Sequence, residues 1–249
     1  MRLILIATVV LLVVCGAWAI PNCPSNTLVS CHEEFNTELG LSTMANWNDP
    51  ILFNQELEQI VFTQGISGAF KVCRAFVDFH TCLGPNWYDC TSPEYFAAYH
   101  YNMSEIDLWS MTFREYHFSC GAGFQNFINN WDCYVSLFMD PAKNATLQKC
   151  FQEYAPGFAY PSEQCGVAKD LLLCLQVEVN RQCNDALAFA FCETIRQGLL
   201  IDFYYCDMTC TQEIALASLS PPEKRLENYI RNPAREAKFA GEQPMKHST

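Results

Sequence analysis

The sequence predicts an all-α protein, a disulfide-stapled bundle of about seven to nine helices. Apolar residues recur at helical spacing along most of the chain. No Asn-Gly or Asp-Gly turn and no sustained alternation of apolar and polar residues indicates a β-hairpin. The chain also contains 15 cysteines, and in a chain that enters the secretory pathway such a number predicts disulfides rather than free thiols.

The N-terminus has the pattern of a secretory signal peptide over residues 1–19. Arg2 precedes an apolar run over 3–14, which is shorter than a membrane-spanning helix. The Ala-Trp-Ala tripeptide at 17–19 matches the small-x-small pattern of a cleavage site. We therefore expect cleavage after residue 19 and a secreted, extracellular protein. Cleavage removes Cys15 and leaves 14 of the 15 cysteines.

Three parts are expected after the signal peptide. Residues 20–64 form an N-terminal cysteine-containing helical extension, and residues 65–210 form a cysteine-rich helical domain. Residues 211–249 form a polar, partly disordered tail, because they lack cysteine and are rich in proline and charge. A short helix over 223–231 is compatible with the tail sequence.

Capping residues indicate where the first helices begin and end. Asp49-Pro50 is a suitable N-cap and first position for a helix over 51–62. A second helix is expected over 67–83, where Gly84-Pro85 ends it. Ser92-Pro93 opens a short third helix.

Further along the chain, Ser104 is expected to cap a helix that ends near Cys120, and one helix is expected over 124–138. Asp140-Pro141 ends that helix and starts the next. The aromatic residues in these segments recur at helical spacing, which predicts buried core faces rather than a cofactor site.

Cys165, Cys174, Cys183 and Cys192 are spaced nine residues apart. Nine residues are two and a half helical turns, so successive cysteines point to opposite faces unless the chain folds back. The polar stretch 180–185 predicts a turn near Cys183, with Asn184 or Asp185 as the next N-cap. In an antiparallel hairpin centred there, Cys174 and Cys192 lie opposite each other, and we predict a Cys174–Cys192 disulfide.

All the cysteines after the signal peptide are expected to form disulfides, although sequence alone does not give their connectivity. No Cys-x-x-Cys occurs, which argues against a zinc ribbon or a thioredoxin-like redox site. The expected disulfide-forming residues are Cys23, Cys31, Cys73, Cys82, Cys90, Cys120, Cys133, Cys150, Cys165, Cys174, Cys183, Cys192, Cys206 and Cys210.

The charge distribution excludes some classes of partner. The formal net charge is −12, and the sequence has no basic stripe, so we expect no nucleic-acid partner and no anionic membrane partner. No later segment is apolar enough for a stable membrane anchor. The expected partner is an unknown extracellular protein or a glycan.

Catalytic and metal-binding motifs are incomplete. His32-Glu33 begins like the zinc motif HExxH, but Asn36 stands where its second histidine would be. His100 and His117 lie among aromatic residues, where a core or boundary histidine is the ordinary interpretation. We therefore expect no catalytic residue, no metal, no cofactor and no enzymatic activity.

Two sequons are candidate modification sites, Asn102-Met103-Ser104 and Asn144-Ala145-Thr146. Both fall at predicted helix boundaries, which are usually exposed. In the secretory pathway we expect Asn102 and Asn144 to accept N-linked glycans.

The cysteine spacing resembles that of a family of secreted domains expanded in nematodes, known as domain of unknown function nineteen. The resemblance rests on CRAFVDFHTCLGPNWYDC at 73–90, YHFSCGAGFQNFINNWDC at 116–133, KCFQEY at 149–154 and CGVAKDLLLCLQVEVNRQC at 165–183. It implies a secreted helical domain with no established activity.

The cysteine rhythm is also similar to that of the chondroitin proteoglycan four type, a second nematode family. That resemblance implies chondroitin attachment at Ser-Gly pairs. Ser67-Gly68 is the only such pair, and it has no acidic flank, so this chain departs from the pattern.

Together these observations predict a secreted, disulfide-rich extracellular interaction module. The alternative is an extracellular carrier of a small hydrophobic ligand, because helical, disulfide-stapled, aromatic-rich carriers such as insect odorant-binding proteins have a similar composition. A carrier requires an enclosed apolar pocket of several hundred cubic ångströms.

Overall fold

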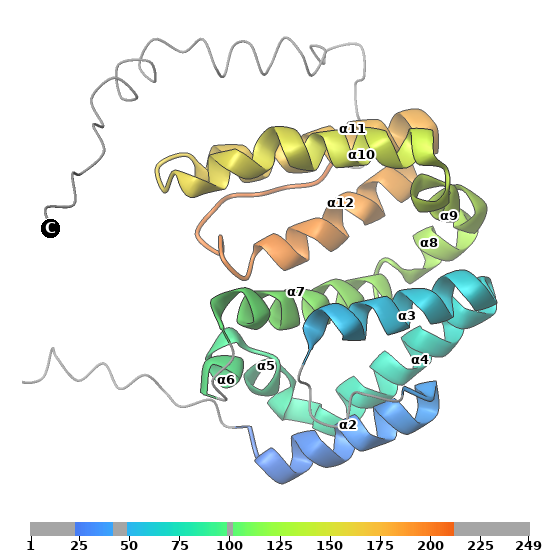
Figure 1. Ribbon diagram of the computed structural model, residues 1–249, viewed down its shortest axis with the longest axis vertical. Coiled ribbons are helices and arrows are strands. Elements are labelled where there is room, and N and C mark those ends of the chain that lie inside the picture. Colours follow the sequence, from blue (N-terminus) through green and yellow to red (C-terminus); the bar gives the residue numbers. More distant parts are fainter. Residues whose placement is uncertain (1–22, 42–48, 99–101, 212–249) are drawn as a thin grey trace, which may run out of the picture. The chain divides into compact units, whose positions relative to one another are not determined.

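The computed structural model describes residues 23–41, 49–98 and 102–211 (Figure 1). These ranges contain helices and no strands, and eight of the helices have at least seven residues. The predicted all-α class and helix number are therefore confirmed. The expected signal peptide, the expected tail after residue 211 and the candidate helix over 223–231 lie outside the described residues.

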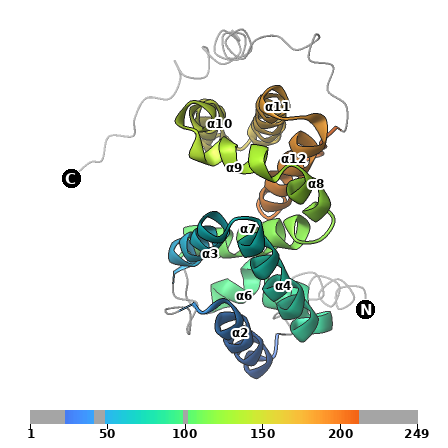
Figure 2. The same ribbon diagram turned by 90° about the vertical axis from the view of Figure 1, so that its right-hand side faces the viewer.

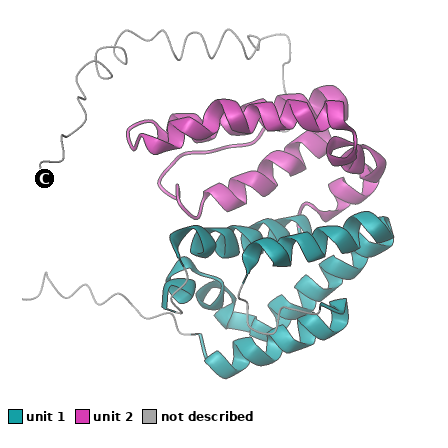
Figure 3. Cartoon of the chain, in the orientation of Figure 1, with its two compact units in different colours: residues 1–121 teal, residues 122–249 magenta. Residues whose placement is uncertain are grey.

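The chain divides into two compact units, residues 1–121 and 122–249 (Figure 3). This division differs from the expected boundary between residues 64 and 65. The N-terminal segment is part of the first unit because disulfides tie Cys23 to Cys90 and Cys31 to Cys82. The expected single domain over 65–210 is accordingly split after Gly121.

The first unit is built around α4, which packs against both α2 and α3 (Figures 1 and 2). Gly68 allows the close approach of α4 to α3, because a Cβ there would lie 2.3 Å from the carbonyl oxygen of Ile60. The helices of this unit are α2 (Ser25–Leu39), α3 (Pro50–Gln64), α4 (Ile66–Leu83), η2 (Gly84–Asn86), α5 (Trp87–Cys90), α6 (Pro93–Ala98) and α7 (Met103–Ser119).

The first unit has an aromatic core. Phe53 and Trp109 are fully buried, with ring centroids 5.1 Å apart, and Phe113 lies 5.9 Å from Trp109. Phe76 and Tyr116 stack at 4.4 Å. Such rings contribute both a large buried apolar area and favourable ring contacts.

Two N-caps position the helices of this core. Asp49 accepts hydrogen bonds from the backbone N–H groups of Ile51 and Leu52, as the sequence predicts. The prediction that Ser104 caps α7 is wrong, because Asn102 is the N-cap and forms a capping box with Glu105. Ser104 lies inside the helix and donates its hydroxyl hydrogen to Asn102 Oδ1.

In the second unit, α11 packs against α10 and α12 (Figures 1 and 2). Its core is mainly aliphatic, and Leu137, Val167, Leu175 and Leu187 are fully buried. The helices are α8 (Phe124–Asn129), α9 (Trp131–Met139), α10 (Pro141–Tyr154), η3 (Ala155–Ala159), α11 (Gln164–Gln182) and α12 (Asp185–Leu199).

The expected single helix over 124–138 is interrupted at Asn130, which separates α8 from α9. Asn130 leaves the helical conformation, with φ −120° and ψ 25°. Its side chain donates to the carbonyl of Asn126 and accepts from Asn184. These bonds compete with the regular helical pattern, which the apolar spacing does not reveal.

The two units share one disulfide connectivity. The six cysteines in the described part of the first unit pair 1–5, 2–4 and 3–6, as Cys23–Cys90, Cys31–Cys82 and Cys73–Cys120. The second unit repeats this order with Cys133–Cys183, Cys150–Cys174 and Cys165–Cys206, and it adds Cys192–Cys210. Since six cysteines allow 15 connectivities, the agreement indicates one helical plan built twice.

Candidate functional site

The structure places all 14 cysteines assigned to disulfides in seven pairs, with Cα–Cα distances from 4.9 to 5.9 Å. These distances are within the normal range for a disulfide. The four evenly spaced cysteines from Cys165 to Cys192 each bond a different partner. Their spacing of two and a half turns therefore directs them to different neighbours.

The predicted Cys174–Cys192 disulfide is wrong. The turn near Cys183 is present, since α11 ends at Gln182 and α12 begins at Asp185. However, Cys174 bonds Cys150 on α10, and Cys192 bonds Cys210 beyond the end of α12. Equal distance from the turn sets the height of a residue along the hairpin but not the face on which its side chain lies.

The first sequon forms the exposed start of α7. Asn102 Oδ1 accepts from Glu105 N at 3.0 Å and from Ser104 Oγ at 2.6 Å. Asn102 itself is exposed. An N-linked sugar attaches to Nδ2 and leaves Oδ1 as an acceptor, so this capping arrangement tolerates a glycan.

The second sequon lies in the first turns of α10. Asp140 caps this helix by accepting from Ala142 N, as predicted, and Pro141 occupies its first position. Asn144 Nδ2 donates to the backbone oxygen of Phe138 at 3.0 Å, which joins α10 to the end of α9. Thr146 Oγ1 donates to Lys143 O and accepts from Gln182 Nε2.

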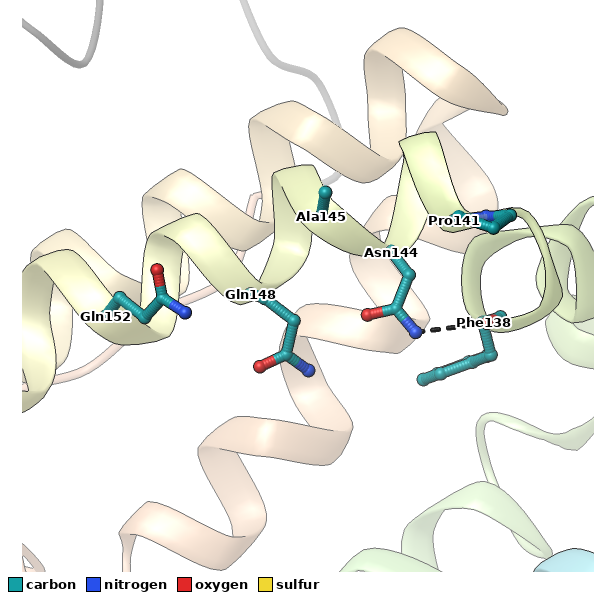
Figure 4. Close-up of a pocket in the computed structure, with 6 residues that line it drawn as sticks. All are labelled: Phe138, Pro141, Asn144, Ala145, Gln148 and Gln152. Atoms are coloured by element: carbon teal, nitrogen blue, oxygen red, sulfur yellow. Dashed lines mark hydrogen bonds between the residues drawn. The ribbon is translucent and has the colours of Figure 1, made fainter.

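Asn144 lines an open hollow of about 570 Å³ on the surface of the second unit (Figure 4). Its side chain and those of Gln148 and Gln152 follow one another at intervals of four residues, so they share one face of α10 (Figure 4). The ring of Phe138 lies beside Asn144. The complete lining is Phe138, Pro141, Asn144, Ala145, Gln148 and Gln152.

The chemistry of the hollow suits a neutral, hydroxyl-rich molecule. None of its six lining residues is charged. Each carboxamide offers both hydrogen-bond donors and an acceptor, and Phe138 adds an apolar surface. Because no lining side chain titrates, the hollow provides no acid–base group and no strong metal ligand.

A second cluster lies in the first unit, where His80 on α4 faces His117 on α7. Their ring centroids are 5.0 Å apart, and Trp87 lies 4.8 Å from His80 and 5.5 Å from His117. Partial burial, the neighbouring His80 and the guanidinium of Arg114 lower the pKa of His117. His117 thus lies at the edge of an aromatic cluster, as predicted, whereas His100 lies outside the described residues.

His32 is a buried titratable group of the first unit. It is 1% exposed, on the core face of α2. Burial lowers its pKa from 6.5 to about 3, although a hydrogen bond with Asn36 partly opposes this effect. The histidine of the incomplete zinc motif is therefore a neutral core residue.

Three apolar side chains form an exposed stripe on α4: Ile66, Phe70 and Val77, which are 41%, 51% and 50% exposed. Their positions fall within about 40° of one another around the helix. Arg74 lies beside this α4 stripe and forms exposed ion pairs with Glu38 and Asp78. Such exposed pairs contribute little stability, so they do little to hold the side chains around the stripe in place.

Ser67-Gly68 is the one candidate site for chondroitin attachment, and the structure gives both residues a role in helix packing instead. Gly68 is buried where α4 approaches α3. Ser67 Oγ donates to the carbonyl of Gln64.

Sequence reasoning did not identify the hollow or the α4 stripe. The only sequence signal for the hollow is the four-residue spacing of Asn144, Gln148 and Gln152. Within the described ranges, no group of three or more metal-ligating side chains is arranged to hold a metal ion. None of the helices in that part of the chain has the length and hydropathy needed to cross a membrane.

Comparison with protein-family models, with curated proteins and with solved structures finds no significant match to this chain. The two family resemblances of the cysteine spacing therefore stay predictions.

Proposed function

We propose that the protein is a secreted, non-catalytic interaction module that binds an extracellular protein. The observation that carries this proposal is the pairing of all 14 cysteines after the expected cleavage position, with a separate set of disulfides in each unit. Disulfides in such number persist in oxidising, extracellular compartments and are rare in the cytosol.

The α4 stripe is the surface that we assign to the partner. Ile66, Phe70 and Val77 expose apolar side chains along one helix face, and exposed apolar side chains grouped on one face are typical of protein contacts. Arg74 at its edge is 79% exposed and is already paired with Glu38 and Asp78. A partner with an apolar face fits the exposed side chains of this stripe.

The test is binding of the fluorescently labelled, secreted protein to intact cells of its source organism. We expect saturable binding that unlabelled protein displaces. Phe70→Glu places a charge in the apolar contact, so it should weaken binding at least tenfold, or about 1.4 kcal/mol. Val29→Glu is the matched control, because Val29 is a 52%-exposed apolar residue on α2.

Two results would each contradict one part of the proposal. Retention of the chain inside the cell would contradict secretion. Equal binding of the Phe70→Glu and Val29→Glu proteins, with both folded by circular dichroism, would contradict the assignment of α4.

The carrier alternative gains no support from the hollow beside Asn144. That hollow is open and contains three carboxamides, whereas a small hydrophobic ligand requires an enclosed apolar site.

A further inference from the structure

We propose that the hollow on α10 holds the first sugars of an N-linked glycan attached to Asn144. This inference rests on the secretion that the proposed function requires, but not on the partner assigned to α4. Asn144 is itself part of the lining. Any sugar chain that starts at its Nδ2 atom therefore starts inside the hollow (Figure 4).

The attachment leaves the local hydrogen bond of Asn144 in place. In the transfer, a bond forms between Nδ2 and C1 of the first sugar. The bond from C1 to the pyrophosphate oxygen of the lipid-linked oligosaccharide donor breaks, the lipid pyrophosphate departs, and Nδ2 releases one proton to the surrounding water. Nδ2 carries two hydrogens before the transfer. The one that remains can still donate to the backbone oxygen of Phe138.

The lining then offers contacts in the order in which a growing sugar chain would meet them. Gln148 and Gln152 lie about 6 and 12 Å from Asn144 along the helix axis, at 1.5 Å per residue. Both are exposed, and their carboxamides can donate to and accept from sugar hydroxyls and acetamido groups. Phe138 is half-buried beside Asn144, and its ring offers an apolar surface to the C–H face of a sugar.

The folded sequon also sets the order of events. The Asn144 amide and the Thr146 hydroxyl are both hydrogen-bonded within the second unit. A glycosyltransferase must bind both groups of the sequon. The sugar is therefore added before α10 packs, and the helix then folds with the sugar chain along its outer face.

The first sequon supplies an internal control. Asn102 is an exposed N-cap at the start of α7 and does not belong to the lining of the hollow. A glycan at Asn102 should therefore be accessible to enzymes, whereas the glycan at Asn144 should be shielded at its attachment point.

The test measures enzymatic release of each glycan from the full-length chain secreted by eukaryotic cells. The native protein is treated with an amidase that cleaves the bond between asparagine and sugar, and mass spectrometry of the peptides follows each site over time. We expect release at Asn144 to be at least tenfold slower than at Asn102. After denaturation the two rates should agree within twofold.

Two paired variants assign the shielding to the hollow. Gln148→Ala with Gln152→Ala should bring the native release rates at the two sites within threefold of each other. Gln55→Ala with Gln59→Ala is the matched control, because these exposed glutamines have the same four-residue spacing on α3. The control pair should leave the tenfold difference unchanged.

The inference is overturned if the secreted protein carries a glycan at Asn102 and none at Asn144. It is also overturned if native release is equally fast at both sites, or if the Gln148 and Gln152 changes leave the difference intact. In these three cases the proposal of a secreted interaction module stands. If the chain does not enter the secretory pathway, both sequons stay empty and both proposals fail together.

Discussion

The two units have the same three-disulfide plan but different interiors. In both, a long central helix carries two cysteines nine positions apart, Cys73 and Cys82 on α4 and Cys165 and Cys174 on α11. The first unit fills the space between its helices with stacked aromatic rings, whereas the second uses leucine, valine and alanine and one additional disulfide.

This difference shows that cross-links and packing constrain the fold separately. The disulfides determine which helices are neighbours. The core residues need only fill the space that remains, and cores tolerate changes of residue type when volume and pattern are kept. The units also differ in titratable groups, because within the described residues every histidine belongs to the first unit.

The largest expected effect comes from the aromatic core. Trp109→Ala removes a fully buried ring that contacts Phe53, Phe96 and Phe113, so it should lower the free energy of unfolding of the first unit by about 3–5 kcal/mol. Hydrogen exchange along a urea titration should place the loss in residues 23–121. Trp131→Ala in the second unit is the control, since Trp131 is only half-buried. A loss spread evenly over both units would contradict separate cores.

The second-largest loss of stability should come from removing the equivalent 2–4 disulfide from each unit. Cys31→Ala with Cys82→Ala opens a loop of 51 residues, and Cys150→Ala with Cys174→Ala opens one of 24. Loop entropy predicts losses of about 4 and 3.5 kcal/mol, respectively. Chemical denaturation with the other six bonds intact, verified by non-reducing peptide mapping, measures both. If one variant unfolds completely while the other is unaffected, the two disulfides do not have equivalent roles in their units.

A smaller difference between the units is expected in how mild acid changes their stability. The pKa of His32 is about 3 in the folded protein and 6.5 without burial, so the unfolded state binds the extra proton. Its stabilising contribution is complete above pH 6.5 and is lost as the pH falls toward 3. Between pH 8 and pH 5 the proton on His32 should by itself remove about 2 kcal/mol of stability, whereas Glu115, whose pKa burial raises to about 8, acts in the opposite direction.

The variant His32→Gln tests this assignment, because glutamine does not titrate. Urea denaturation at several pH values should show that between pH 8 and pH 5 the variant loses about 2 kcal/mol less stability than the unchanged protein, whatever its stability at pH 8. An unchanged slope would assign the acid sensitivity to another group.

The smallest effects are expected at the helix caps. Asp49→Ala on α3 and Asp140→Ala on α10 each remove an acceptor for backbone N–H groups. Each change should lower the free energy of unfolding by about 1 kcal/mol. Thermal unfolding measures the loss. The serine variants at the same positions keep an N-cap acceptor, and they should recover most of it. A serine as damaging as alanine would show that capping is not the cause.

Local features of the structure could be predicted from the sequence because they depend on neighbouring residues. Asp49, Asp140 and Asn184 cap the helices that the sequence assigns to them. Helical class likewise follows from the spacing of apolar residues. Asn144 was identified as a candidate by its sequon, but the hollow around it was not, since Phe138 reaches it from α9.

The features that could not be predicted depend on which face of one helix meets another. Cys174 bonds α10 rather than α12, and no spacing within 165–192 reveals this. The interruption at Asn130 depends on side-chain bonds to Asn126 and Asn184. The boundary after Gly121 depends on disulfides that connect the N-terminal segment to residues more than 50 positions later.

Each of the seven disulfides among the described residues closes within one unit. Within that part of the protein, the peptide bond between Gly121 and Ala122 therefore lies on the only covalent path from one unit to the other. A protease that cuts there would produce two cross-linked fragments that a non-reducing gel resolves. Most disulfide-rich chains need a reductant before a single cut separates their pieces, but this one can be divided by hydrolysis alone. After such a cleavage each unit would keep its own set of disulfides.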